Sequence, residues 1–142
     1  MTHWPDNLPR RGIGVLGGTF DPVHNGHIAL ARAAREALGL QRVDFAPAAA
    51  PWQKDVLTAP EARLAMLEAA VAGKEGLGVE LADLLRPGPT YTIDTLAELR
   101  ERLGPGMPLV LILGADQWNN LHTWRDWRRF TDYASLGVAS SA

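Results

Sequence analysis

The sequence predicts a Rossmann-like α/β domain, a doubly wound parallel sheet of about five strands with helices on both faces. Short apolar runs alternate along the chain with longer segments whose apolar residues recur at helical spacing. One run, residues 107–116, is almost entirely apolar, which is typical of a strand in the middle of a parallel sheet. Regular alternation of strand and helix implies crossover connections, which place successive strands parallel.

Each expected element follows from a local pattern. Apolar runs bounded by Gly or Pro predict strands, and segments rich in Ala and Leu predict helices. Strands are expected at residues 12–17, 42–48, 77–83, 107–116 and 135–140. Helices are expected at residues 27–39, 59–73 and 92–104, with short helical pieces around 118–121 and 124–130.

Two patterns predict particular helix ends. Gly39 stands where the first helix should stop, as a glycine C-cap. Thr58, with Glu61 three residues later, has the spacing of a capping box and predicts the N-cap of the second helix.

Composition indicates one ordinary globular domain. The 142 residues are 46% hydrophobic and 21% charged, which suffices for a self-contained core. A formal net charge of −2 predicts no general attraction to nucleic acid or membrane, so any anion site must be local. The absence of cysteine excludes disulfides, thiolate catalysis and cysteine-ligated zinc. With no secretory signal and no membrane-spanning apolar run, we expect a cytoplasmic protein in which residues 1–11 form a flexible leader.

Gly12, Gly14 and Gly17 spell G-x-G-x-x-G, the pattern of a dinucleotide-binding turn. That turn needs a strand before its first glycine and a helix opening near its last. Here no strand pattern precedes Gly12, and a proline and an Asn-Gly pair interrupt the segment after Gly17. The sequence therefore disfavours NAD binding, and Gly12 and Gly14 are expected inside the first strand.

Parallel α/β sheets bind ligands beyond the carboxyl ends of their strands. That rule selects residues 17–27, 48–54, 87–92 and 114–124 as the candidate site. In the first of these stretches, Gly17 and Gly18 allow backbone N–H groups to approach a ligand closely.

His24 and His27 stand three residues apart at the start of the first helix. If the first turn has begun, both rings share a face above N–H groups that favour phosphate, and both could donate hydrogen bonds to its oxygens. For an isolated H-x-x-H pair, ordinary loop and helix-start residues are the commoner interpretation. A metal pair is a weaker one, because His122 is the only obvious further histidine and no acidic cluster accompanies them.

The full string GGTFDPVHNGH, residues 17–27, is more specific than its parts. It resembles the signature of the H-x-G-H nucleotidyltransferase superfamily, and within it the bacterial nicotinate-nucleotide adenylyltransferase family. Three further stretches are similar to that family, namely PAAAPWQK (47–54), PTYTIDTL (89–96) and GADQWNNLHTW (114–124). The first departs from the family's P-P-H-K, since Pro51, Trp52, Gln53 and Lys54 stand there. The likeness makes residues 12–142 the nucleotidyltransferase domain.

The resemblance implies transfer of AMP from ATP to nicotinate mononucleotide, giving nicotinate adenine dinucleotide and pyrophosphate in NAD biosynthesis. The mononucleotide phosphate would attack directly, so catalysis would consist of positioning and charge stabilisation by Thr19, His24 and His27. Mg²⁺ is expected with ATP, held by phosphate and water, with no metal bound by protein side chains. The implied ATP and phosphate site consists of Gly17, Gly18, Thr19, Phe20, His24, His27, Lys54, Gly114 and Asp116.

For the nicotinate end, the implied residues are Thr92, Trp124 and Arg125. Trp124 would stack on the pyridine ring, and the backbone around Thr92 and Arg125 would hold the carboxylate. Without the resemblance, Trp124 is better interpreted as a half-buried helix aromatic. Asp116 could hydrogen-bond a ribose hydroxyl, cap the following helix, or do both.

Two alternatives accompany this interpretation. The acceptor could instead be nicotinamide mononucleotide or pantetheine phosphate. The family also continues past the fifth strand with an I-S-x-T-x-I-R segment that helps to hold ATP, whereas this sequence ends at VASSA. The domain is therefore expected to be short at its C-terminus, and an inactive nucleotide-binding form is the alternative from another class.

Overall fold

The computed structural model describes residues 12–48, 58–86, 88–89 and 91–139, so the expected leader at 1–11 lies outside the described residues. The expected fold class is confirmed: five parallel strands form one sheet in the order β3-β2-β1-β4-β5. The strands are β1 (Ile13–Gly18), β2 (Arg42–Pro47), β3 (Leu77–Val79), β4 (Leu109–Gly114) and β5 (Ser135–Ala139). The helices are α1 (Asn25–Leu38), α2 (Pro60–Val71), α3 (Ala82–Leu85), α4 (Thr92–Leu103) and α5 (Ala115–Asn119), with 3₁₀ helices η1 (Leu121–Thr123) and η2 (Trp127–Asp132).

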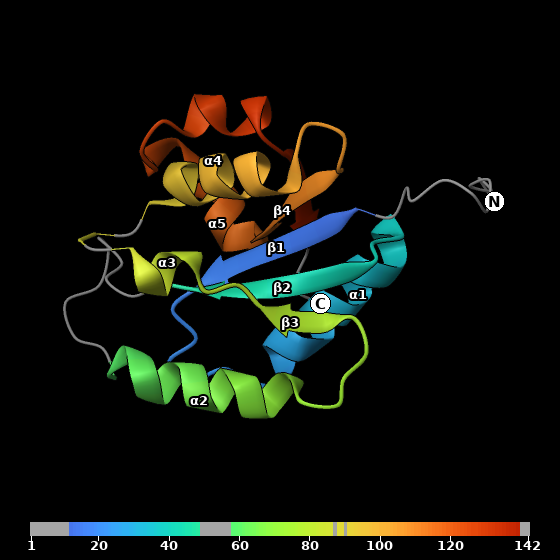
Figure 1. Ribbon diagram of the computed structural model, residues 1–142, viewed down its shortest axis with the longest axis vertical. Coiled ribbons are helices and arrows are strands. Elements are labelled where there is room, and N and C mark those ends of the chain that lie inside the picture. Colours follow the sequence, from blue (N-terminus) through green and yellow to red (C-terminus); the bar gives the residue numbers. More distant parts are fainter. Residues whose placement is uncertain (1–11, 49–57, 87, 90, 140–142) are drawn as a thin grey trace.

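Helices cover both faces of the sheet (Figure 1). Helices α1 and α2 lie on one face, and α4 lies on the other. Because successive strand residues point to opposite faces, β1 contributes Leu16 to the first apolar layer and Val15 to the second. Leu67 of α2 and Leu96 of α4 are fully buried in these two layers. The sheet is thus packed on both sides, as a doubly wound fold requires.

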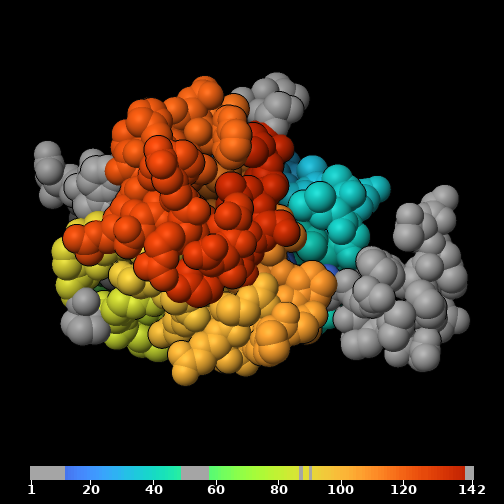
Figure 2. Space-filling model, turned by 90° about the horizontal axis from the view of Figure 1, so that it is seen from above, coloured from blue at the N-terminus to red at the C-terminus, as the bar shows by residue number. Residues whose placement is uncertain are grey.

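The segment after β4 packs beside α4, as the orange and red surface next to the yellow helix shows (Figure 2). Phe130 of η2 is fully buried in this contact. Arg100 of α4 donates to the Tyr133 carbonyl at 3.0 and 2.7 Å, and to the carbonyls of Gly104 and Met107 at 2.8 and 2.7 Å. One guanidinium therefore joins α4 to the chain on both sides of β4.

Strand β3 is shorter than the strand predicted at residues 77–83. It ends at Val79, and residues 82–85 form α3. The Glu80 N–H still donates to the Phe45 carbonyl at 2.7 Å, but the Glu80 carboxylate accepts the Ala82 N–H at 3.0 Å. This local bond turns the chain away from the sheet and places Asp83 on a short helix at the end of β2 and β3.

The predicted cap of α2 is also wrong. Its N-cap is Ala59, which makes no side-chain cap bond, and Pro60 occupies the first helical position, where a missing N–H costs nothing. Thr58 lies outside the helix, and its N–H donates to Asp21 Oδ2 at 3.0 Å. The predicted end of α1 is confirmed, since Gly39 is a left-handed C-cap with a φ of 63°.

Two glycines of β1 have different surroundings. A Cβ at Gly14 would lie 2.8 Å from the Cδ1 atoms of Ile112 and Leu40 and 3.2 Å from Val43 Cγ2, so this glycine is closely packed in the core. A Cβ at Gly17 would meet no atom within 4 Å. Gly14 therefore serves packing, whereas Gly17 borders open space at the carboxyl end of the strand.

We expect Gly14→Ala to lower the free energy of unfolding by about 1–3 kcal/mol, because the added methyl overpacks the core. Gly17→Ala is the matched control and should change it by less than about 0.5 kcal/mol. Urea denaturation followed by circular dichroism measures both. Equal losses in the two variants would contradict this account of Gly14.

Candidate functional site

A cavity of about 740 Å³ lies at the carboxyl ends of β1 and β4. The strand order reverses there, since β1 pairs with β2 on one side and with β4 on the other. Ligands of parallel α/β sheets bind at such a point. Lys54 of the predicted site lies outside the described residues. The other predicted site residues all line the cavity, namely Gly17, Gly18, Thr19, Phe20, His24, His27, Thr92, Gly114, Asp116, Trp124 and Arg125.

The backbone turns after β1 at Thr19 and Phe20. Phe20 has a φ of 49°, a left-handed conformation that costs a bulky residue about 1–3 kcal/mol. Its buried ring meets the Phe45 ring at 5.3 Å and the His27 ring at 5.0 Å, both edge-on. The Phe20 side chain therefore supports His27, a role that the sequence pattern did not reveal.

His24 and His27 share one face of the first turn of α1, as their spacing predicts. His24 is the N-cap residue, and its ring stacks on the His27 ring with centroids 3.7 Å apart and planes inclined by 22°. The His24 N–H donates to His27 Nδ1 at 3.0 Å, and the Gly26 N–H donates to His24 Nδ1 at 3.1 Å. The two imidazoles are thus held by the backbone at the mouth of the helix.

These bonds assign the tautomers of both rings. An Nδ1 that accepts a hydrogen bond carries no proton, so in each neutral ring the proton is on Nε2. Neither Nε2 has a hydrogen-bond partner among the described residues. Burial lowers the pKa of His27 below its ordinary value of 6.5, and the adjacent His24 lowers it further. The pair can therefore offer two N–H donors to the cavity without being charged.

Gln117 joins the carboxyl ends of β4 and β1. Its Oε1 accepts the Gly114 N–H at 2.9 Å, and its Nε2 donates to the Gly17 carbonyl at 3.5 Å. Gly114 is the N-cap of α5, so the alternative in which Asp116 caps this helix is wrong. Asp116 lies instead in the first turn of α5, exposed along the cavity.

Thr92, Trp124 and Arg125 come together along another part of the cavity wall. Trp124 is half-buried, meets Phe130 edge-on at 6.1 Å and also lines the cavity. It lies in the bend between η1 and η2, so its expected half-burial is confirmed and its expected helical position is wrong. The Arg125 guanidinium lies 4.1 Å from the centre of the Tyr91 ring, a cation–π contact. Tyr91 is the N-cap of α4 and makes no side-chain cap bond, so among the described residues no side chain caps the first turn, where Thr92 stands.

Arg63 of α2 is a residue of this region that the sequence pattern did not single out. It is 1% exposed, and it donates to three carbonyls, those of Thr19 at 2.9 Å, Ala48 at 2.6 Å and Thr58 at 2.9 Å. A buried guanidinium is tolerable only when its donors are satisfied in this way. Arg63 and Leu67 lie four residues apart and share the buried face of α2. An arginine at helical spacing from a buried leucine was therefore the sequence feature that could have revealed a buried Arg63.

The described ranges contain neither a metal centre nor a membrane span. Within them, no three His, Asp or Glu side chains lie close enough together to hold a metal ion. Within the same ranges, no helix combines the length and the hydrophobicity needed to cross a bilayer.

Comparison with known proteins agrees with this geometry. A family model described as cytidylyltransferase-like matches residues 15–141. The chain belongs to the cytidylyltransferase-like family. A Bordetella pertussis protein named probable nicotinate-nucleotide adenylyltransferase is 48% identical over 131 residues, which cover 90% of this chain and 64% of that protein. This family member spans 60–64% of the length of the curated relatives that it matches.

Solved structures share the fold of this family member. A Vibrio parahaemolyticus structure described as a nicotinate-nucleotide adenylyltransferase has a TM-score of 0.77 at 14% identity, covering 92% of this chain and 74% of that chain. Plasmodium falciparum nicotinic acid mononucleotide adenylyltransferase, complexed with NaAD, has a TM-score of 0.72 at 16% identity, covering 92% of this chain and 75% of that chain. At identities this low, the TM-scores show a common fold and nothing more.

We expect nuclear magnetic resonance titration to give His27 a pKa below 6.5, the ordinary value. The His24→Ala variant should raise the pKa of His27, because it removes a neighbouring charge and part of the cover over the ring. Because the pKa of His27 is lower in the folded protein than the ordinary value of 6.5, folding favours the neutral imidazole. The free energy of unfolding should therefore decrease as the pH falls through 6.5. A His27 pKa at or above 6.5 in the unmutated protein would contradict this geometry.

Proposed function

We propose that the protein transfers AMP from ATP to nicotinate mononucleotide, forming nicotinate adenine dinucleotide and pyrophosphate. The observation that carries the proposal is a single cavity lined by two chemically different sets of side chains. One wall has two stacked imidazoles at the N-terminus of α1, and the other has Trp124 beside the start of α4. Relatives named for this activity support the proposal, as does the shared fold with a neighbour complexed with NaAD. The proposed setting of this reaction is the cytoplasm.

The reaction needs no covalent enzyme intermediate. A phosphate oxygen of the mononucleotide attacks the α-phosphorus of ATP, a new P–O bond forms, and the bond to the β-phosphate breaks as pyrophosphate leaves. The attacking phosphate is already an anion, so no protein base is required. The chain's contribution is to align the two phosphates and to stabilise charge on the α-phosphate.

In this proposal the phosphate wall acts through N–H donors. His24 and His27 donate from Nε2 to phosphoryl oxygens as negative charge develops, and both can do so while neutral. Backbone N–H groups around Gly18 and Phe20, with the Thr19 hydroxyl, receive the polyphosphate. Gly17 leaves room for close approach, since a Cβ there would meet no atom within 4 Å. Lys54, which lies outside the described residues, is expected to add a cation.

Two further groups bind ATP in this proposal. Gly114 ends β4 beside the nucleotide, and the exposed carboxylate of Asp116 accepts a hydrogen bond from a ribose hydroxyl. Mg²⁺ travels with ATP and neutralises charge on the polyphosphate when it is bound. The expected ligands of this ion are phosphate and water oxygens. Among the described residues, no three His, Asp or Glu side chains are grouped so as to hold a metal ion.

The acceptor wall recognises a flat ring that carries a carboxylate. Trp124 stacks on the pyridine ring, and the backbone N–H groups at Thr92 and Arg125 hold the carboxylate. The support for this assignment is the start of α4, where the N-cap residue Tyr91 makes no side-chain cap bond and an anion is electrostatically favoured.

Replacing His27 with Ala should lower kcat about 10²–10³-fold, because one preorganised donor to the transition state is lost. The matched control is His122→Ala, since His122 is exposed on η1 and does not line the cavity. Pyrophosphate release with ATP, Mg²⁺ and nicotinate mononucleotide measures both variants. An unchanged rate in His27→Ala removes this residue from the mechanism. Binding of ATP by the full-length protein with no product from any acceptor would instead favour a nucleotide-binding module.

Trp124→Ala should weaken the binding of nicotinate mononucleotide by about 1–3 kcal/mol, because ring stacking is its main contact. Trp118→Ala is the matched control, since Trp118 is 48% exposed and lies outside the cavity lining. Calorimetric titration with nicotinate mononucleotide, nicotinamide mononucleotide and pantetheine phosphate compares the acceptors. Tight binding of pantetheine phosphate that is unaffected by Trp124→Ala would point to a non-aromatic acceptor.

A further inference from the structure

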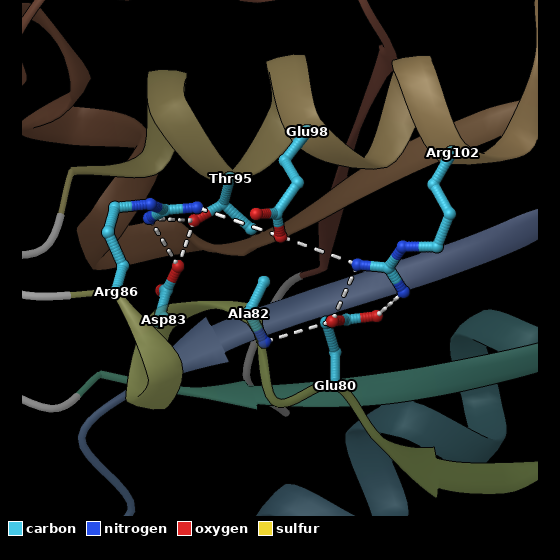
Figure 3. A network of polar contacts seen from close by, with 7 residues as sticks. All are labelled: Glu80, Ala82, Asp83, Arg86, Thr95, Glu98 and Arg102. Carbon is cyan, nitrogen blue, oxygen red and sulfur yellow. Dashed lines mark hydrogen bonds and ion pairs between the residues drawn. The ribbon is translucent and has the colours of Figure 1, made fainter.

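Two polar clusters join the chain after β3 to helix α4 (Figure 3). The Asp83 cluster consists of Asp83, Arg86 and Thr95. The Glu80 cluster consists of Glu80, Glu98 and Arg102. Figure 3 shows both clusters bridging from the α3 region to α4, with Arg86 and Arg102 reaching toward Glu98 from its two sides.

The Asp83 cluster is buried and compact. Asp83 is 6% exposed and Thr95 is 3% exposed. The Thr95 hydroxyl donates to Asp83 Oδ1, and Arg86 Nη1 donates to the same oxygen at 3.0 Å and to Thr95 Oγ1 at 3.4 Å. Three groups thus share one set of hydrogen bonds, and removal of one leaves the other two incompletely satisfied.

The net effect of its surroundings in this cluster is to raise the pKa of Asp83. Burial raises the pKa of Asp83, while the hydrogen bond from Thr95 and the charge of Arg86 act in the opposite direction. Arg86 Nη2 is buried without a hydrogen-bond partner among the described residues, and its contact with Glu98 Oε2 is an ion pair at 3.8 Å. Burying a guanidinium nitrogen without a hydrogen bond costs free energy, so packing alone does not account for Arg86 at this position.

The position of the cluster supplies that reason. Thr92 and Thr95 lie three residues apart on α4 and both line the cavity, as Asp83 does. Arg86 is the C-cap residue of α3 and Thr95 lies in the first turn of α4, so the cluster joins the end of one helix to the start of the other. The start of α4 is the part of the cavity wall that the proposed function assigns to the acceptor carboxylate.

We propose that Asp83, Arg86 and Thr95 are positioning residues that fix the start of α4 for binding of the acceptor mononucleotide. This inference rests on the proposed function, because it names the wall that receives the acceptor. The Thr95 hydroxyl holds the first turn of α4 against α3 through Asp83. Arg86 neutralises the Asp83 carboxylate, so a buried negative charge does not face an anionic acceptor.

The Glu80 cluster provides an internal control. Arg102 donates to both Glu80 carboxylate oxygens at 2.9 and 3.0 Å, and it approaches Glu98 at 3.4 Å. Burial by itself raises the pKa of Glu80, but the bonds from Arg102 and the Ala82 N–H outweigh it and lower the pKa. This cluster joins the same elements, yet none of its three side chains lines the cavity. It should therefore affect stability without affecting the acceptor.

The test compares Thr95→Val, Thr95→Ser and Arg102→Gln with the unmutated full-length protein. Valine keeps the shape of threonine and removes only the hydroxyl, whereas serine keeps the hydroxyl. We expect Thr95→Val to raise KM for nicotinate mononucleotide about tenfold, the scale of one buried hydrogen bond, with KM for ATP unchanged within about twofold. Thr95→Ser should keep KM for nicotinate mononucleotide at the value of the unmutated protein. Arg102→Gln should lower the melting temperature and leave both KM values unchanged.

Two results would overturn the inference. One is an unchanged acceptor KM in a folded Thr95→Val protein. The other is a parallel rise in both KM values that follows the melting temperature and recurs in Arg102→Gln, which indicates a structural role only. If Thr95→Val does not fold, Arg86→Gln gives the same test at a partly exposed position and should raise KM for the acceptor alone.

The unmutated protein separates this inference from the proposed function. If it forms no nicotinate adenine dinucleotide and calorimetry detects no binding of nicotinate mononucleotide, the proposed function is wrong. The assignment of this wall to the acceptor is then wrong as well. If the unmutated protein is active and Thr95→Val matches it in acceptor KM and dissociation constant, the inference alone fails.

Discussion

Parallel pairing of β1 with both β2 and β4 is the constraint on which the rest of the structure depends. It places the end of β1 at the reversal of strand order, so the turn through Thr19 and Phe20 lies between two diverging walls. Gly14 allows that strand to pack closely, because a side chain there would meet Ile112 and Leu40. The cavity is therefore a product of sheet order, and the loops that line it start from strand ends that cannot move independently.

Buried polar side chains then hold these loops in place. Arg63 ties the carbonyls of Thr19 and Ala48 to the start of α2, on the side of the cavity that includes Thr19. Asp83 and Thr95 tie α3 to α4 on the other side. Each arrangement satisfies a buried charged group with hydrogen bonds, and each ends at a segment that lines the cavity. The two walls are thus fastened by separate networks, which allows the substitutions on one wall to be tested against binding at the other.

The periodic elements and the shared face of the histidine pair were predictable from the sequence. Long apolar periods specify where helices and strands lie, and the His24–His27 spacing specifies that both rings share a face once the turn is helical. The errors are local. Thr58 fits a capping pattern, but Pro60 starts the helix, and Glu80 ends β3 early by bonding to the following turn. Such competition between a side chain and the backbone is decided by contacts that a linear pattern does not contain.

By itself, the sequence determined the alternation of elements, the fold class and the residues at the strand ends, because these depend on period and on local turn chemistry. Only the tertiary structure decided which of those residues meet. It brought Thr92, Trp124 and Arg125 to the same cavity as the histidine pair, and it turned Arg63 and Asp83 from ordinary charged residues into the supports of that cavity. The physical reason is that burial and hydrogen-bond partners arise between segments far apart in the chain, where sequence spacing carries no information about distance.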